Sequence, residues 1–297
     1  MSTLGVAAPP RPAGVRLLRR RLLDRVMSAL LLIVTVLLLL LLAVIVGYIV
    51  VRGASAINFD FFVQLPKPVG AVGGGVANAL LGTVELILLA SCLGVPIGIL
   101  GGVYLAEFGD NPVADLVSFM ADVLAGIPSI VIGIFAYAVV VIPMHRFSAL
   151  AGGFALGILM VPIIMRTSVG ILRLVPATLR EASLALGASE RATILRVVLP
   201  AATGGIVTGV MLAIARVAGE TAPLLFTAFG NEYWQFSVDK ATAALPLQIF
   251  QYAISPYADW QAKAWAGSLV LIVLVVLTSL MARLATRNAS VGLGRQR

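Results

Sequence analysis

The fold of this chain is decided by the stretch Arg180-Glu181-Ala182-Ser183-Leu184-Ala185-Leu186-Gly187, which leads on to Leu199-Pro200. It is charged and rich in small residues, and long apolar runs lie on both sides of it. Thr178 and Glu181 have the spacing of a capping box at the start of a first helix. Gly187 can supply the left-handed turn that ends this helix, and Ser189 can cap a second one. We therefore predict two short helices that protrude between two membrane spans, the second span beginning at Pro200.

Composition places the chain among membrane proteins. Of its 297 residues, 60% are hydrophobic and 11% are charged, and the mean hydropathy is +1.06. No polar region is long enough for a catalytic domain. The single cysteine, Cys92, excludes an internal disulfide, and the single histidine, His145, lies in no cluster of metal ligands, so we expect no metal site.

Six apolar spans are predicted, and the fold class is therefore an all-α membrane protein. They lie near residues 26–51, 76–104, 116–143, 147–165, 200–229 and 264–282. The first contains no charge and is long enough to cross a hydrocarbon core of about 30 Å; it is too long for a signal-peptide core, which favours an uncleaved anchor. Glycine and proline in the second to fifth spans permit close packing and bending. The predicted parts are a basic tail (1–25), a six-helix domain (26–285) with a central loop (171–200), and a second tail (286–297).

The distribution of basic residues predicts the orientation. Six spans put both termini on one side, together with the central loop. Residues 1–25, 166–196 and 283–297 hold six, five and four arginines, whereas the opposite side holds five basic residues. By the positive-inside rule, both termini and the central loop are cytoplasmic.

The spacing in the central stretch resembles the EAA loop of the permease subunits of ABC importers. The matching positions are Glu181, Ala182, Ser183, Gly187, Leu199 and Pro200. Ser183 stands where the pattern has its third small residue, alanine, and Val197 stands for the usual isoleucine. The resemblance implies a type I (MetI-like) permease fold, in which this loop is a coupling helix that docks on a separate ATP-hydrolysing subunit. Taken alone, Glu181 is equally well explained as a helix cap.

Arg216 and Glu220 are the charged residues that stand out in the fifth predicted span. Four residues apart, they share one face of a continuous helix. Arg216 lies about 24 Å along that helix from Pro200. A charge at membrane depth is costly and normally faces a cavity or a partner, and a guanidinium there can bind an oxyanion through paired donors. The alternative is a structural ion pair that holds helices together.

Two further motifs resemble one subfamily, the PstA-type permeases of the phosphate ABC importer. They are Ala215-Arg216-Val217-Ala218-Gly219-Glu220-Thr221-Ala222-Pro223-Leu224-Leu225 and Gly126-Ile127-Pro128-Ser129-Ile130-Val131-Ile132-Gly133. The likeness covers most of residues 76–285. It implies a PstC-like sister permease, a dimer of PstB-like ATPases, a PstS-like phosphate-binding protein outside, and Arg216 and Glu220 on the phosphate path. ATP and Mg would be on the ATPase, and we expect no cofactor on this chain. The chain has no Gly-Lys pair for a Walker A loop and is predicted to be non-catalytic.

Three other functions remain open at this stage. A permease for another oxyanion, such as molybdate or sulfate, belongs to the same class. An ATP-independent anion transporter or channel and a membrane protein that only reports external phosphate belong to other classes. Glu85 and Asp122 are left out of the predicted site, because an acid is a poor ligand for an anion. We expect Glu85 to pair with an arginine or to occupy a hydrated packing site, and Asp122 to be interfacial.

Overall fold

The computed structural model describes residues 14–71 and 73–294, with the side chains of residues 19–71 and 73–281. It divides into two units, residues up to Val51 and residues from Arg52 onward. The first unit holds most of helix α1 (Gly14–Ala54). The predicted tails, 1–25 and 286–297, lie partly outside the described residues. Residues 14–25 belong to α1, and residues 286–294 belong to the last helix, α13.

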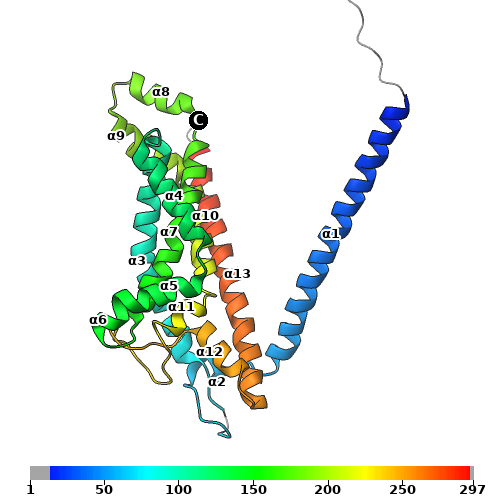
Figure 1. The fold of residues 1–297 in the computed structure, drawn as a ribbon, viewed down its shortest axis with the longest axis vertical. Coiled ribbons are helices and arrows are strands. Elements are labelled where there is room, and N and C mark those ends of the chain that lie inside the picture. The colour runs from blue at the N-terminus through cyan, green and yellow to red at the C-terminus, as the bar shows by residue number, and fades with distance from the viewer. Residues whose placement is uncertain (1–13, 72, 295–297) are drawn as a thin grey trace, which may run out of the picture. The chain divides into compact units, whose positions relative to one another are not determined.

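The regular secondary structure in the described part of the second unit is helical, apart from an isolated bridge between Phe229 and Thr242, and loops join the helices. Its elements are α2 (Phe59–Val63), α3 (Ala77–Glu107), α4 (Pro112–Gly126), α5 (Ser129–Ala136), the π-helix η1 (Tyr137–Val141), α6 (Ile142–Met144), α7 (Ala149–Arg173), α8 (Ala177–Ala185), α9 (Glu190–Thr193), the π-helix η2 (Ile194–Val198), α10 (Leu199–Val217), α11 (Ala222–Leu225), α12 (Leu245–Ala253) and α13 (Ala258–Gly294). Figure 1 shows α8 and α9 at one end of this unit, with α2 and α12 at the other.

The predicted multi-pass helical fold is confirmed. Five helical stretches in the described part of the chain are long and apolar enough to span a membrane: Arg19–Ala54, Ala77–Glu107, Ala149–Arg173, Glu190–Val217 and Ala258–Met281. A sixth span exists only if the bent pair Pro112–Gly126 and Ser129–Met144 is counted as one.

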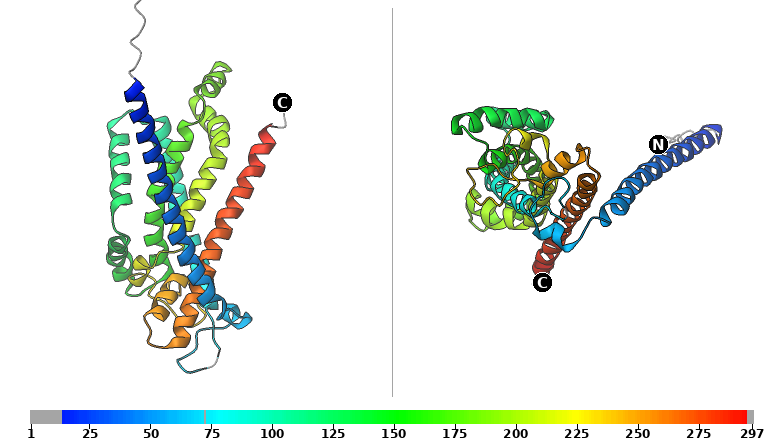
Figure 2. Two further views of the ribbon diagram at one scale, coloured as in Figure 1. Left: turned by 90° about the vertical axis from the view of Figure 1, so that its right-hand side faces the viewer. Right: turned by 90° about the horizontal axis from the view of Figure 1, so that it is seen from below.

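The third predicted span, 116–143, is therefore not a straight helix. Its two halves meet at an angle of 104°. A residue that precedes proline is disfavoured in helical conformation, and Ile127, which precedes Pro128, is extended with a ψ of 132°. As a result, α5 to α6 form a rod that lies across the bundle, as the two views in Figure 2 show.

The fifth predicted span, 200–229, has different ends in the structure. The helix begins at Glu190 and ends at Val217, so Pro200 lies inside it. Proline has no N–H to donate, and the helix adapts through the wider turn of η2, in which the Leu199 N–H donates to the Ile194 carbonyl five residues back. At its far end the chain leaves the helix and restarts at α11, where Pro223 occupies the first turn, a position that tolerates proline.

The predicted capping box is wrong, whereas the other two local predictions for the central loop are confirmed. Helix α8 begins directly after Pro176, so Thr178 is already inside its first turn and no side chain caps it. Gly187 has a φ of +83°, and the bonds Gly187 N–H to Leu184 O (2.9 Å) and Ala188 N–H to Ser183 O (3.2 Å) form a Schellman motif. The Ser189 hydroxyl accepts from the Ala192 N–H at 3.3 Å.

Helices α3 and α7 run parallel and pack closely through glycines. Gly94, Gly98 and Gly102 of α3, spaced four residues apart, face successively later residues of α7. A Cβ placed on Gly98 would lie 2.7 Å from the Ile164 Cβ, and one on Gly94 would lie 2.8 Å from the Met160 Cβ. The small residues therefore permit the close packing that the sequence predicts.

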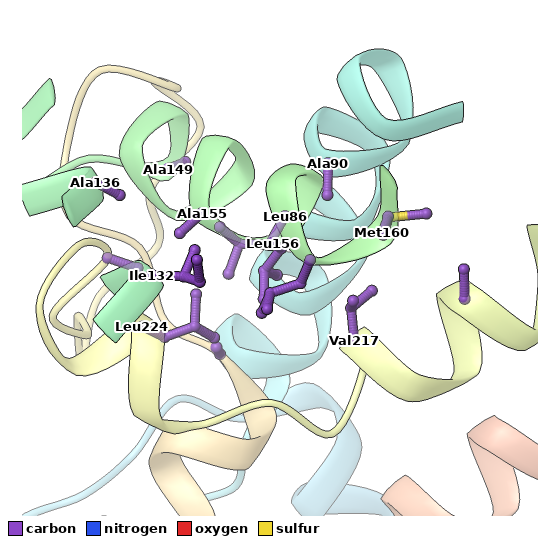
Figure 3. Packing of buried hydrophobic residues seen from close by; sticks show 14 of the residues in the cluster. Leu86, Ala90, Ile132, Ala136, Ala149, Ala155, Leu156, Met160, Val217 and Leu224 are labelled. Carbon is purple, nitrogen blue, oxygen red and sulfur yellow. The ribbon is translucent and has the colours of Figure 1, made fainter. Parts of the chain in front are cut away.

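The main core is centred on α7. Figure 3 shows Leu156 of α7 beside Leu86 of α3, with Val217 of α10 and Leu224 of α11 directed toward the same cluster. Ile132 of α5 belongs to this cluster as well. With Leu247 of α12, six helices contribute buried residues to one core, and it includes the residues on both sides of the break after α10.

We predict that Gly98→Ala destabilises the protein by about 1–3 kcal/mol, the usual cost of overpacking a core. Gly170→Ala is the matched control, because a Cβ at this helical glycine of α7 meets nothing within 4 Å. The measurement is the thermal unfolding midpoint of each purified variant in detergent. Equal midpoints for the two variants would show that the α3–α7 contact is looser than described here.

Candidate functional site

The break after α10 determines the positions of Arg216 and Glu220. Arg216 is in the last turn of α10, where the helix dipole favours a cation. Glu220 lies beyond the helix end, in a turn where its N–H donates to the Val217 carbonyl at 3.1 Å. The prediction that the two residues share one helical face is therefore wrong, because the helix does not continue through residues 218–221.

Neither of these two side chains has a partner within the described part of the chain. Arg216 is exposed and Glu220 is half-buried, and neither forms a hydrogen bond or ion pair with another described residue. The alternative, a structural ion pair that holds helices together through these residues, is thus not observed among the described residues. Thr208, Leu212 and Arg216 form an exposed stripe on α10 at four-residue spacing. An unpaired charge at membrane depth is costly, and the described residues supply no partner for this guanidinium.

The two motifs at residues 126–133 and 215–225 meet in space. Gly133 of α5 packs against Pro223 of α11, so closely that a Cβ on the glycine would lie 2.6 Å from the Pro223 Cα. Ile132 and Leu224, their neighbours, belong to the main core (Figure 3). The transverse rod of α5 to α6 therefore supports the break beside Arg216.

The segment that follows α11 is fastened to the start of α7. The N–H groups of Ser148, Ala149 and Leu150 donate to the carbonyls of Thr227, Lys240 and Val238 at 2.9–3.0 Å. The first amides of a helix lack partners within the helix, and these carbonyls supply them. A hydrogen bond from the Ser237 hydroxyl, together with Arg146 nearby, holds the pKa of the Asp239 carboxyl below its usual range. This fastening keeps the break and α11 in a fixed position on the bundle.

The predicted coupling residues fall into two groups. Glu181, Ala182 and Ser183 lie on α8, which Gly187 ends, and no residue of α8 is buried. The Glu181 side chain is exposed and has no described partner. Leu199 and Pro200 instead lie within the continuous helix, directly after η2, where Leu199 packs against the cluster that contains Leu172 and Val198.

Several polar contacts were not found by sequence reasoning. Arg180 forms an ion pair with Glu107 at the end of α3, and Arg166 of α7 forms one with Asp122 of α4, a residue predicted only to be interfacial. Each pair joins residues far apart in the sequence, and no local pattern identifies the partners.

Glu85 has a threonine, not an arginine, as its described partner. The Thr242 hydroxyl lies 3.3 Å from its carboxylate. A search of the described residues finds no group of three or more His, Cys, Asp and Glu side chains that could hold a metal ion.

Comparison with known proteins gives one consistent result. The family described as binding-protein-dependent transport system inner membrane component matches residues 94–291. The chain is 45% identical over 235 residues to the phosphate transport system permease protein PstA of Yersinia pestis, covering 79% of this chain and 80% of that protein. It is 44% identical over 275 residues to PstA of Xylella fastidiosa strain Temecula1 (91% and 95%), and 37% identical over 289 residues to PstA of Mycobacterium leprae (94% of each).

A solved structure supports the fold. An inward-facing conformation of the MetNI methionine ABC transporter superimposes with a TM-score of 0.57 at 21% identity, covering 72% of this chain and 94% of that one. The family model and the sequence identity over most of the chain establish the family: the chain is a multi-pass membrane protein that belongs to the binding-protein-dependent transport system inner membrane components, among the relatives named PstA.

Proposed function

We propose that this chain is the PstA-type permease subunit of an ATP-driven importer of inorganic phosphate in the bacterial plasma (inner) membrane, with both termini cytoplasmic. The relatives named PstA support the cargo. Within the molecule, the observation that carries the proposal is the exposed guanidinium of Arg216, which has no described partner and lies beside a break in a membrane helix.

Arg216 is suited to transient binding of an oxyanion. A guanidinium offers paired donors that match the oxygens of phosphate. The backbone of the break beside it is irregular, and membrane proteins tolerate irregular backbone at membrane depth only where it is buried in protein or lines a cavity. Glu220, four residues on, supplies a negative charge that disfavours tight retention of an anion. Such a site binds phosphate weakly enough to release it to the cytoplasm.

The energy comes from other subunits. We propose a PstC-like sister permease that completes the path, a PstB-like ATPase dimer that holds ATP and Mg, and a PstS-like binding protein that delivers phosphate. This chain is the non-catalytic membrane component. Helix α8 offers the ATPase an exposed surface with the free carboxylate of Glu181, and rocking of the helices would open the path alternately to the two sides of the membrane.

Reconstitution of the chain with these partner subunits in liposomes tests the cargo. We expect that phosphate, delivered by the binding protein, stimulates ATP hydrolysis and accumulates in the lumen, whereas sulfate and molybdate do neither. Stimulation by another oxyanion but not by phosphate would reassign the cargo within the same class of importer. Uptake that persists without any ATPase would contradict the ATP-driven mechanism.

The substitution Arg216→Ala tests the path. We expect phosphate uptake to fall at least tenfold, since hydrogen bonds to charged groups are worth about 1.5–3 kcal/mol, while the complex still assembles. Arg216→Lys should recover only part of the uptake, because lysine keeps the charge but loses the paired donors. Leu212→Ala, on the same exposed stripe, is the control and should transport normally. Normal uptake by Arg216→Ala would reduce the arginine to a scaffold residue.

The substitution Glu181→Lys tests the coupling surface. Because Glu181 is exposed and lacks a described partner, reversing its charge should leave the fold intact and weaken only the contact with the ATPase. We expect uptake per ATP hydrolysed to fall about fivefold or more, because the coupling between linked sites typically changes an equilibrium by at least that factor. Asp110→Lys makes the same charge change in the exposed turn before α4 and should have little effect. Unchanged coupling in Glu181→Lys would remove this residue from the proposed interface.

A further inference from the structure

We infer that Arg180 is a positioning residue that links the coupling helix α8 to the paired ends of α3 and α7, so that the bundle follows when α8 moves. The inference rests on the proposed function and assigns the point at which movement enters the bundle. It concerns a residue that does not itself contact the cargo.

The link consists of one guanidinium nitrogen that contacts two helices. Arg180 Nη2 lies 2.6 Å from Glu107 Oε1 and donates to the Leu172 carbonyl at 3.1 Å. The side chains of Arg180 and Glu107 are only 27% and 10% exposed. Solvent therefore screens this pair less than the Arg146–Asp239 pair at the other end of the bundle, where both side chains are more exposed.

Helix dipoles explain why a cation belongs at this position. Glu107 is the last residue of α3, and Leu172 lies in the last turn of α7. Because α3 and α7 are parallel, the negative ends of both dipoles lie side by side, and the Glu107 carboxylate adds a further negative charge. A carboxylate is unfavourable at a helix C-terminus, and a cation there is favourable. Arg180 compensates all three groups at once, which gives the link a strong preference for this geometry.

The rest of α8 is held only lightly. None of its residues is buried, and residues of α8 and of the bundle, among them Glu107, Arg180, Leu184 and Glu190, together line a hollow. Its other described side-chain bond joins the hydroxyls of Ser183 and Thr193, 2.9 Å apart. Thr193 belongs to the continuous helix that becomes α10.

The contacts that Arg180 and Ser183 make therefore connect α8 to different parts of the bundle. Ser183 connects α8 to α10, the helix that carries Arg216. Arg180 connects α8 to the α3–α7 pair, on which the core is built. Without Arg180, α8 can tilt with the ATPase while α3 and α7 do not move. ATP hydrolysis then continues, but the path no longer opens with each cycle of hydrolysis.

The test uses the complete reconstituted complex. In Glu107→Gln, which loses the charge and keeps the shape, and in Arg180→Ala, we expect phosphate transported per ATP hydrolysed to fall about fivefold or more, with assembly and ATP turnover retained. Arg173→Ala is the matched control, because Arg173 is an exposed arginine at the same end of α7 with no described ion pair. For Arg173→Ala, phosphate transported per ATP hydrolysed should stay within twofold of the value for the unmodified complex, a smaller change than the fivefold loss expected for the other two variants.

A cross-link distinguishes transmission of movement from a purely structural role. The variant Glu107→Cys/Arg180→Cys, made in a Cys92→Ser background, should be uncoupled, and a reducible bifunctional methanethiosulfonate of suitable length should restore coupling. Reductant should abolish the rescue. Coupling that is normal without the cross-link, or a rescue that survives reduction, would overturn the inference.

A distance measurement keeps this test independent of the cargo. Spin labels at Leu186, which is 89% exposed, and at Phe108 report the separation of α8 from the end of α3. In the unmodified complex we expect the same distance without nucleotide and with trapped ATP, since the two elements move together. In Glu107→Gln the distance should differ between these states. If the label distance responds to nucleotide in the same way in both complexes, the link is refuted. If phosphate fails to stimulate ATP hydrolysis by the unmodified complex, the proposed cargo alone is refuted.

Discussion

The close parallel contact of α3 with α7 is the constraint on which the rest of the structure depends. It exists because Gly94, Gly98 and Gly102 leave room for the opposing helix, in a setting where association relies on packing and hydrogen bonds more than on the hydrophobic effect. Helices α4, α5, α10 and α11 all pack on α7. The parallel arrangement also brings two helix C-termini together, and this creates the negative site that Arg180 occupies. Packing inside the membrane and the attachment of α8 thus have one cause.

Proline marks the places where the bundle departs from regular helices. A proline lies two residues after the end of each π-helical segment: Pro143 after η1 and Pro200 after η2. The bend before α5 occurs at Pro128, and Pro223 lies in the first turn after the break. Wider turns of this kind are frequent at functional sites. Here η2 lies between α8 and Arg216 in the chain, and a permease that moves needs helices that can bend.

Local chemistry predicted the features that depend on one or two neighbouring residues, such as the turn at Gly187 and the cap at Ser189. It failed at Thr178, because Pro176 starts α8 two residues earlier and leaves the threonine inside the helix. Apolar runs predicted the membrane class and most spans, but hydropathy does not distinguish a bent rod from a straight one, so the turn at Pro128 was missed. The Glu107–Arg180 pair could not be predicted, since its partners are 73 residues apart and meet only when α3 and α7 are packed. The sequence identified Arg216 because a charge within a membrane span is costly. That Arg216 has no partner among the described residues became known only from the structure.

The central claim is that energy from a separate ATPase enters this chain through α8 on the cytoplasmic side. Its most direct test is the sidedness of α8 in membrane vesicles that contain Leu186→Cys in a Cys92→Ser background, treated with a membrane-impermeant maleimide. We expect labelling in inside-out vesicles and not in right-side-out ones, and we expect bound ATPase subunits to block it. Labelling from the outer face, or labelling that the ATPase does not alter, would contradict the account.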